Sequence, residues 1–179
     1  MPGKTDFSRF NCSLARALGS VGDWWSLLVV REALFGASRF SEFQQRLGIA
    51  KNILAARLDA LTAAGVLARE GSARRPLYTL TDKGQELLPA LVALMQWGDK
   101  WESGGKPPVI ATDQTGKALE PVRLLGKDGA QLTAKNIGFK LGPGADAATR
   151  RYFKQVVAEN VLAEQCQDND RQLSPERSA

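Results

Sequence analysis

Residues 40–80 read FSEFQQRLGIAKNILAARLDALTAAGVLAREGSARRPLYTL, and the spacing of their apolar residues decides the fold. Two runs have apolar residues three and four apart, and each run ends at a glycine: Phe40, Phe43, Leu47 and Gly48 in the first, and Leu54, Leu58, Leu61 and Gly65 in the second. Such spacing places the side chains on one face of a helix, and a glycine commonly follows the last turn. The stretch therefore begins with two predicted helices joined by a tight turn.

After Gly65 the spacing changes from a helical to an alternating one. This pattern predicts strands over Val66–Arg69 and Leu77–Leu80, with a turn over Gly71–Pro76 between them. Two arginines, Arg74 and Arg75, lie in that turn and give the hairpin a basic tip. Helix, tight turn, helix and basic hairpin is the order of elements in a winged helix-turn-helix, whose second helix enters the major groove of DNA.

The flanking segments add three predicted helices. A short one covers Cys12–Leu18, and a nearly all-apolar central helix covers Trp24–Phe35 with Asp23 as its N-cap. Thr81 caps a third helical stretch, in which Pro89 marks a kink or a restart. We therefore expect a mainly α fold with a small β component.

The composition changes after residue 103, where glycines and prolines indicate a boundary. The predicted organisation is a flexible N-terminus over 1–10, a winged helix-turn-helix domain over 11–103, a C-terminal extension over 106–166 and a disordered tail over 167–179. The extension is expected to form a small antiparallel sheet and then an amphipathic helix, from Val109–Thr112, Val122–Leu125, Ile137–Leu141 and Asp146–Gln165.

Charge and composition limit the classes of function that the protein can have. The net charge is +5, and nine basic against five acidic residues between Arg31 and Lys83 place +4 of it there, which favours a polyanionic partner. The chain has no histidine, and its cysteines, Cys12 and Cys166, are too few for a zinc site. We therefore expect no enzymatic activity, no metal and no cofactor. Without a long apolar stretch or a signal sequence, the chain is expected to be soluble and cytoplasmic.

The second helix of the pair carries the candidate base-reading residues. Its side opposite the leucines presents Asn52, Ala55, Ala56 and Asp59. Asparagine pairs with adenine, alanine contacts the thymine methyl group, and arginine or lysine contacts guanine or phosphate. The predicted DNA-binding residues are Arg39, Ser41, Arg46, Ala50, Lys51, Asn52, Ala55, Ala56, Arg57, Arg74 and Arg75. Alternatively, the alanines serve helix propensity and the arginines serve solubility.

Several motifs resemble those of the HxlR-type regulators, winged-helix transcription factors related to the MarR group. They are Cys12–Leu18, Gly22–Leu28, Arg31–Gly36, Arg39–Phe43, Gly48–Leu54, Arg57–Leu58 and Tyr78–Gly84, and together they span about Asn11 to Trp101. The resemblance implies a homodimer on double-stranded DNA, with two recognition helices in successive major grooves of a short inverted repeat, that represses or activates nearby genes. The predicted dimer contacts are Leu14, Leu18, Leu94, Trp97 and Trp101, although the tryptophans are equally compatible with an ordinary core.

The sequence indicates less about the regulation of the protein than about its fold. Cys12 stands where many family members carry a cysteine, and the resemblance implies a possible redox sensor there. A small buried apolar residue is the favoured alternative, because Arg16 is the one cation near it in sequence. The extension can shelter a small-molecule effector, extend the dimer contact or cover the core.

A winged helix that binds a protein instead of DNA is the alternative function.

Overall fold

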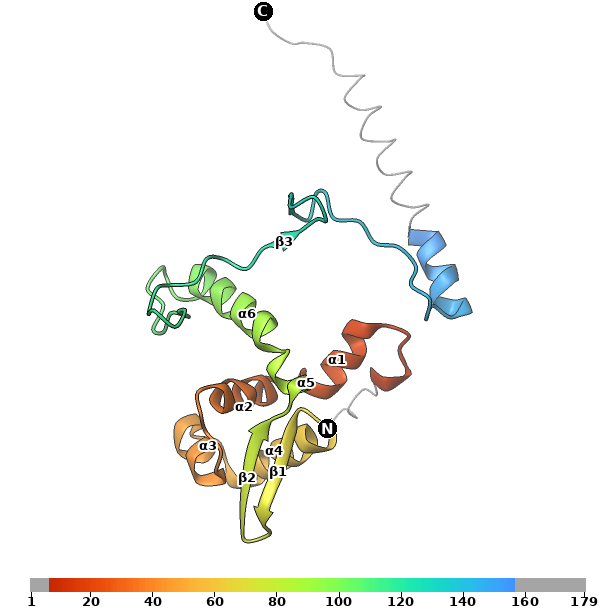
Figure 1. The fold of residues 1–179 in the computed structure, drawn as a ribbon. Helices are drawn as coiled ribbons and strands as arrows, with labels where there is room; N and C mark the ends of the chain where they lie inside the picture. Colours follow the sequence, from red (N-terminus) through yellow and green to blue (C-terminus); the bar gives the residue numbers. More distant parts are fainter. Residues whose placement is uncertain (1–6, 157–179) are drawn as a thin grey trace, which may run out of the picture.

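The computed structural model describes residues 7–156 of the chain. A 3₁₀ turn, Phe7–Arg9, precedes the winged-helix unit. This unit consists of α1 (Ser13–Val21), α2 (Trp24–Leu34), α3 (Phe40–Leu47), α4 (Lys51–Ala63), β1 (Leu67–Ser72), β2 (Arg75–Leu80), α5 (Asp82–Gln85) and α6 (Leu88–Trp101). Figure 1 shows the hairpin of β1 and β2 projecting from the helices, while α6 leads away on the opposite side. The expected mainly α, winged helix-turn-helix fold is confirmed.

Local signals in the sequence explain where the helices begin and end. The Asp23 carboxylate accepts the Trp25 N–H at 3.0 Å and caps α2, as expected. Gly48 ends α3 at a φ of 62°, in the left-handed region that glycine tolerates best. Pro89 lies in the first turn of α6, where its missing N–H costs no helical hydrogen bond, so it marks a restart after α5.

The core lies between α2, α3, α4 and the base of the hairpin. Its fully buried apolar side chains are Val29, Val30, Phe43, Leu54, Leu58, Leu61, Val66 and Leu67. The Phe43 ring packs edge-on against Tyr78 of β2, with ring centroids 6.5 Å apart. The leucines that the helical spacing placed on one face of α4 are those that the core buries, so the orientation of this helix follows from its own sequence.

The wing is longer and its turn shorter than the alternating pattern predicted. The β1–β2 register runs from Leu67 opposite Leu80 to Ser72 opposite Arg75, which leaves Ala73 and Arg74 in the turn. Gly71, expected to lie in the turn, adopts a φ of 83° within β1 and lets the pairing continue. The Tyr78 N–H also donates to the Ser38 carbonyl at 2.8 Å, which ties the chain before α3 to the wing.

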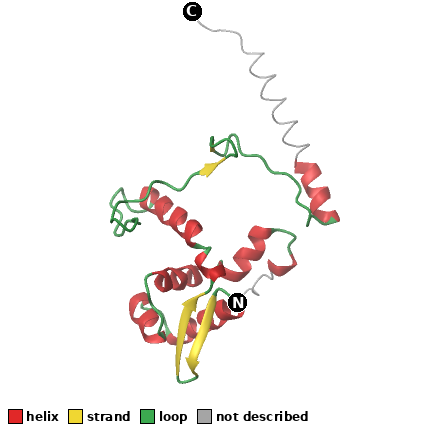
Figure 2. Cartoon of the chain, viewed as in Figure 1, coloured by secondary structure: helices red, strands yellow, loops and turns green. Residues whose placement is uncertain are grey.

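The extension contains little regular structure (Figure 2). β3 (Leu124–Leu125) pairs with β4 (Gln131–Leu132), and the expected strand Val109–Thr112 is reduced to a single bridge from Thr112 to Ala118. The expected strand Ile137–Leu141 is wrong: a turn at 134–136 redirects the chain, and the segment after it is irregular.

The last predicted helix is described in part. Residues 147–156 are helical, whereas the rest of the predicted helix to Gln165, Cys166 and the predicted disordered tail 167–179 lie outside the described residues. Across 7–156, no helix has the length and apolar character needed to cross a membrane.

Candidate nucleic-acid interface

One side of α4 remains uncovered. Leu54, Leu58 and Leu61 are fully buried, whereas the predicted base-reading residues on the other side are exposed: Lys51, Asn52, Ala55 and Ala56. Small side chains on an exposed helical face let the backbone approach another surface closely. The geometry of α4 is therefore that of a recognition helix.

The beginning of α4 adds to this surface. Ala50 occupies the N-cap position with an extended backbone and makes no side-chain cap to the first turn. Amide groups in the first turn of a helix attract anions, because their N–H groups point outward and the helix dipole is positive there. Lys51 adds an exposed ammonium group at the same end. This end of α4 suits a backbone phosphate.

The wing borders the recognition helix. Figure 1 shows the hairpin alongside α4, and an ion pair of 3.8 Å joins Arg69 on β1 to Asp59 on α4. The Arg69 guanidinium also lies 5.9 Å from the centre of the Tyr78 ring. Arg74 in the turn and Arg75 at the start of β2 are both exposed. Recognition helix and basic wing thus form one continuous surface.

Two predicted phosphate contacts have partners within the chain. Arg57 lies 3.2 Å from the Asp23 carboxylate and is 21% exposed, so it joins α4 to the beginning of α2. Arg46 donates to the Phe35 carbonyl at 3.2 Å and lies 3.7 Å from the buried Glu32 carboxylate. Sequence spacing placed both arginines beside the DNA-facing side, but it contained no information about these partners on α2.

The beginning of α3 is held by a carboxylate. Glu42 accepts N–H groups from Ser38 at 2.8 Å and from Arg39 at 2.9 Å. These two backbone hydrogen bonds, with smaller contributions from Arg46 and Arg39, lower the pKa of Glu42 below its ordinary value of 4.5. Arg39 and Ser41, two further predicted DNA contacts, are exposed at this end of α3.

The predicted dimer contacts are exposed in the single chain. Trp97 and Trp101 on α6 are 54% and 63% exposed, and Leu14, Leu18 and Leu94 are exposed as well. The alternative interpretation of the two tryptophans as core residues is therefore wrong for the single chain. These five exposed side chains give α1 and α6 apolar surface, and of the five, Trp101 has the Lys100 ammonium 4.7 Å from the centre of its ring.

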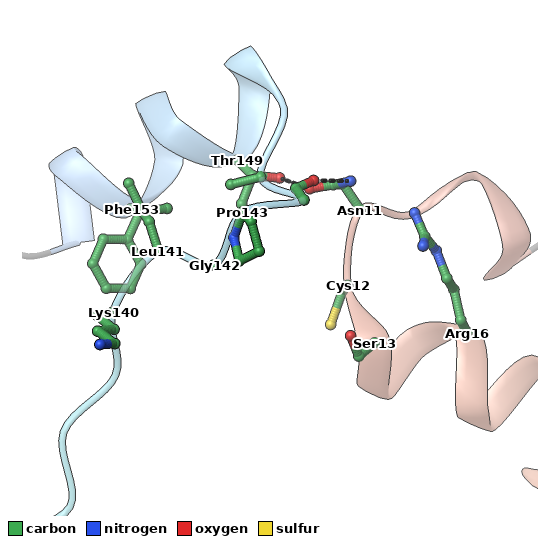
Figure 3. Close-up of a pocket in the computed structure, with 12 residues that line it drawn as sticks. Asn11, Cys12, Ser13, Arg16, Lys140, Leu141, Gly142, Pro143, Thr149 and Phe153 are labelled. Atoms are coloured by element: carbon green, nitrogen blue, oxygen red, sulfur yellow. Dashed lines mark hydrogen bonds between the residues drawn. The ribbon is translucent and has the colours of Figure 1, made fainter.

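Cys12 lies in a pocket rather than in the core. The favoured expectation of burial is wrong, because Cys12 is exposed at the beginning of α1. A pocket of about 340 Å³ separates α1 from the extension, and Cys12, Arg16, Lys140 and Phe153 contribute to its lining (Figure 3). The described residues 7–156 contain no group of three histidine, cysteine or acidic side chains arranged for a metal ion.

Several known proteins are similar to this chain. The HxlR-like helix-turn-helix family model matches residues 20–105. The uncharacterized HTH-type transcriptional regulator Mb3122 of Mycobacterium bovis is 36% identical over 140 residues, which cover 75% of this chain and 89% of that protein. Among solved structures, the candidate transcription factor PA1607 is 39% identical with a TM-score of 0.70, covering 76% of this chain and 99% of its own.

A second solved structure, the candidate transcription factor PA1374 from Pseudomonas aeruginosa, is 35% identical with a TM-score of 0.58, covering 79% of this chain and 99% of its own. The alignment with Mb3122 is longer than the range 20–105, so the likeness continues outside the winged-helix core. The chain belongs to the HxlR-like helix-turn-helix family and is a transcriptional regulator of that type.

Proposed function

We propose that the protein acts as a homodimer that binds a short inverted repeat in double-stranded DNA. In each protomer, α4 enters the major groove and the wing contacts the adjoining minor groove or its phosphates. The observation that supports this proposal is the uncovered side of α4, lined by Asn52, Ala55 and Ala56, beside an exposed pair of arginines at the wing.

The proposed contacts divide into two kinds. Lys51, Asn52, Ala55 and Ala56 face the base edges, which carry the sequence information. The exposed Arg39, Ser41, Arg74 and Arg75 contact phosphates or the minor groove. Arg57 and Arg46 have a positioning role in this proposal, because their ion pairs with α2 orient α4 and α3.

The proposed dimer follows from the size of the DNA surface that one unit covers. A single DNA-binding module buries roughly 600–1,000 Å² of protein surface, at the low end for specific binding. Two modules about one helical turn apart double the phosphate contacts and read both halves of an inverted repeat. The exposed apolar side chains on α1 and α6 supply a surface for this pairing.

The test is the dependence of DNA affinity on salt concentration. Each phosphate contact releases counterions, so log K should fall steeply with log salt for a duplex enriched by this protein from a random pool. Replacing Arg74 and Arg75 by alanine should flatten the slope by roughly 1 to 2 units per protomer. The matched control is Arg150→Ala with Arg151→Ala, an exposed pair in the helix of residues 147–156, which lies away from the wing (Figure 1). An unchanged slope in the wing variant would remove the wing from the contact.

The alternative is a winged helix that binds a protein through the same face. A gel shift distinguishes the two functions, because a module that binds only protein would not retard any DNA duplex. The excess of positive charge between Arg31 and Lys83 favours DNA. A response to an oxidant or another small-molecule effector stays a prediction, and so does the expected lack of enzymatic activity.

A further inference from the structure

The extension lacks a hydrophobic core of its own. No residue from 93 to 156 is buried within the chain. Between residues 106 and 146, seven large apolar side chains are exposed: Val109, Ile110, Leu119, Val122, Leu124, Leu125 and Phe139. An isolated two-stranded hairpin is marginally stable at best, and β3 and β4 have two residues each. The extension therefore leaves these seven side chains uncovered on its own protomer.

Hydrogen bonds nevertheless hold the extension to the winged-helix unit at two places. Near its beginning, the Gln96 side chain on α6 donates to the Glu120 carbonyl at 3.1 Å and accepts the Val122 N–H at 2.7 Å. Near its end, the Asn11 side chain donates to the Gly144 carbonyl at 3.1 Å and accepts the Thr149 hydroxyl at 2.9 Å. Figure 1 shows the chain between these points arching from the end of α6 to the beginning of α1.

The two attachment points lie at the helices that carry the proposed dimer contacts. Gln96 precedes Trp97 on α6, and Asn11 precedes α1, which carries Leu14 and Leu18. The extension therefore runs between the two helices that carry these exposed apolar side chains. A second protomer seated on α1 and α6 would lie beside the arch of each chain.

The area that a stable dimer needs also favours a second copy of this chain as the partner of the extension. At roughly 100 Å² of exposed apolar surface for each such side chain, the five on α1 and α6 supply about 500 Å². A stable protein interface takes about 800 Å² from each partner. The seven side chains of the extension raise the apolar total to about 1,200 Å², so a dimer that includes the extension would bury more than twice the apolar area available on α1 and α6 alone.

We propose that residues 106–146 form an arm that packs on a second copy of this chain. Leu124, Leu125 and Phe139 would contact the exposed apolar side chains of α6 in that copy. A twofold axis would make the contact reciprocal, so that each protomer lends its arm and receives one. The proposal rests on the proposed homodimer, and it adds the segment that completes the interface.

Site-specific photo-crosslinking in the full-length protein tests this contact. With p-benzoylphenylalanine in place of Phe139, irradiation should give a covalent species of twice the 19.4 kDa chain mass. Peptide mapping of that species should join the arm to Leu88–Trp101. The same probe in place of Ala73, in the wing turn, should give no such species. Crosslinks confined to single chains, in a sample that sedimentation shows to be dimeric, would overturn the arm and leave the dimer intact.

A paired substitution supplies a measurement independent of the probe. Leu124→Ser with Leu125→Ser should raise the monomer–dimer dissociation constant about tenfold or more, since it removes two apolar side chains from the interface. Gln114→Ser with Lys117→Ser, an exposed polar pair in the same extension, should leave it unchanged. An unchanged constant in the leucine variant would contradict the arm. A monomeric wild-type protein would refute both the arm and the proposed homodimer, whereas a dimer that binds no DNA would refute only the proposed function.

Discussion

Gly84 lies where a side chain would collide with its neighbours. It is buried in α5, and a Cβ atom built on it would lie 2.3 Å from the Val66 carbonyl oxygen and 2.8 Å from a methyl group of Leu80. The Thr81 hydroxyl, which accepts the Gly84 N–H at 3.2 Å, donates to the Gly65 carbonyl at 2.6 Å. The turn after the wing thus closes directly onto the end of α4, and a side chain would separate the two.

We therefore expect Gly84→Ala to lower the free energy of unfolding by about 1–3 kcal/mol, the usual cost of an extra group in a packed site. Urea unfolding measures this change. Gly138→Ala is the matched control: its added Cβ would meet no atom within 4 Å, so the change should stay within about 0.5 kcal/mol. Equal effects of the two substitutions would show that the space around Gly84 does not matter.

The pH dependence of stability should show the role of Glu42. Backbone N–H groups lower its pKa below 4.5, so the ionised carboxylate stabilises the folded state above that pH. This stabilisation is lost as the pH falls through the lowered pKa of the folded state. Urea unfolding of Glu42→Gln should therefore show its largest deficit against wild type near neutral pH, and the deficit should shrink as the pH falls through the lowered pKa. A deficit that stays constant with pH would contradict this assignment.

At the scale of elements, α4 has a buried face and an exposed face. Substitutions on the exposed face should change DNA affinity without changing stability. Ala55 is exposed, so Ala55→Glu should leave stability nearly unchanged while placing a carboxylate against the negatively charged duplex. We expect at least about a tenfold loss of affinity for the enriched duplex, measured by fluorescence anisotropy. Gln85→Glu adds the same charge on α5 and should have little effect. Equal losses in both variants would mean that net charge alone sets the affinity.

The elements also show what the sequence alone predicts. Helices α2, α3 and α4 are specified locally, by the Asp23 cap, by Gly48 and by leucines at helical spacing, so their prediction succeeded. The ion pair of Arg57 with Asp23 joins residues far apart in sequence, and helical spacing does not reveal it. Ile137–Leu141 has the composition of a strand, but a strand needs a neighbour, and composition does not tell whether one is present.

At the scale of the whole molecule, the proposed dimer makes α6 decisive for DNA binding. Trp97→Ala with Trp101→Ala removes two exposed aromatic side chains, and large aromatic groups dominate the energetics of many interfaces. We expect the dimer dissociation constant to rise about tenfold or more, and affinity for the inverted repeat to fall with it. Analytical ultracentrifugation and anisotropy measure the two effects.

Trp24→Ala is the control for this variant. Trp24 is also an exposed tryptophan, but it lies at the beginning of α2 and outside the predicted contact, so the dimer should persist after its substitution. A double α6 variant that dimerises as tightly as wild type would contradict the proposed role of α6.

The dimensions of the wing have one more consequence for the molecule. Six residues in each strand, at about 3.3 Å per residue, give the hairpin a reach of about 20 Å. Half a turn of B-form DNA measures about 17 Å along its axis. In the proposed complex the length of the hairpin therefore sets where its arginines meet the DNA. Substitutions of Ala73 keep this length and are tolerable, whereas insertions or deletions in the strands would move the arginines away from the neighbouring groove.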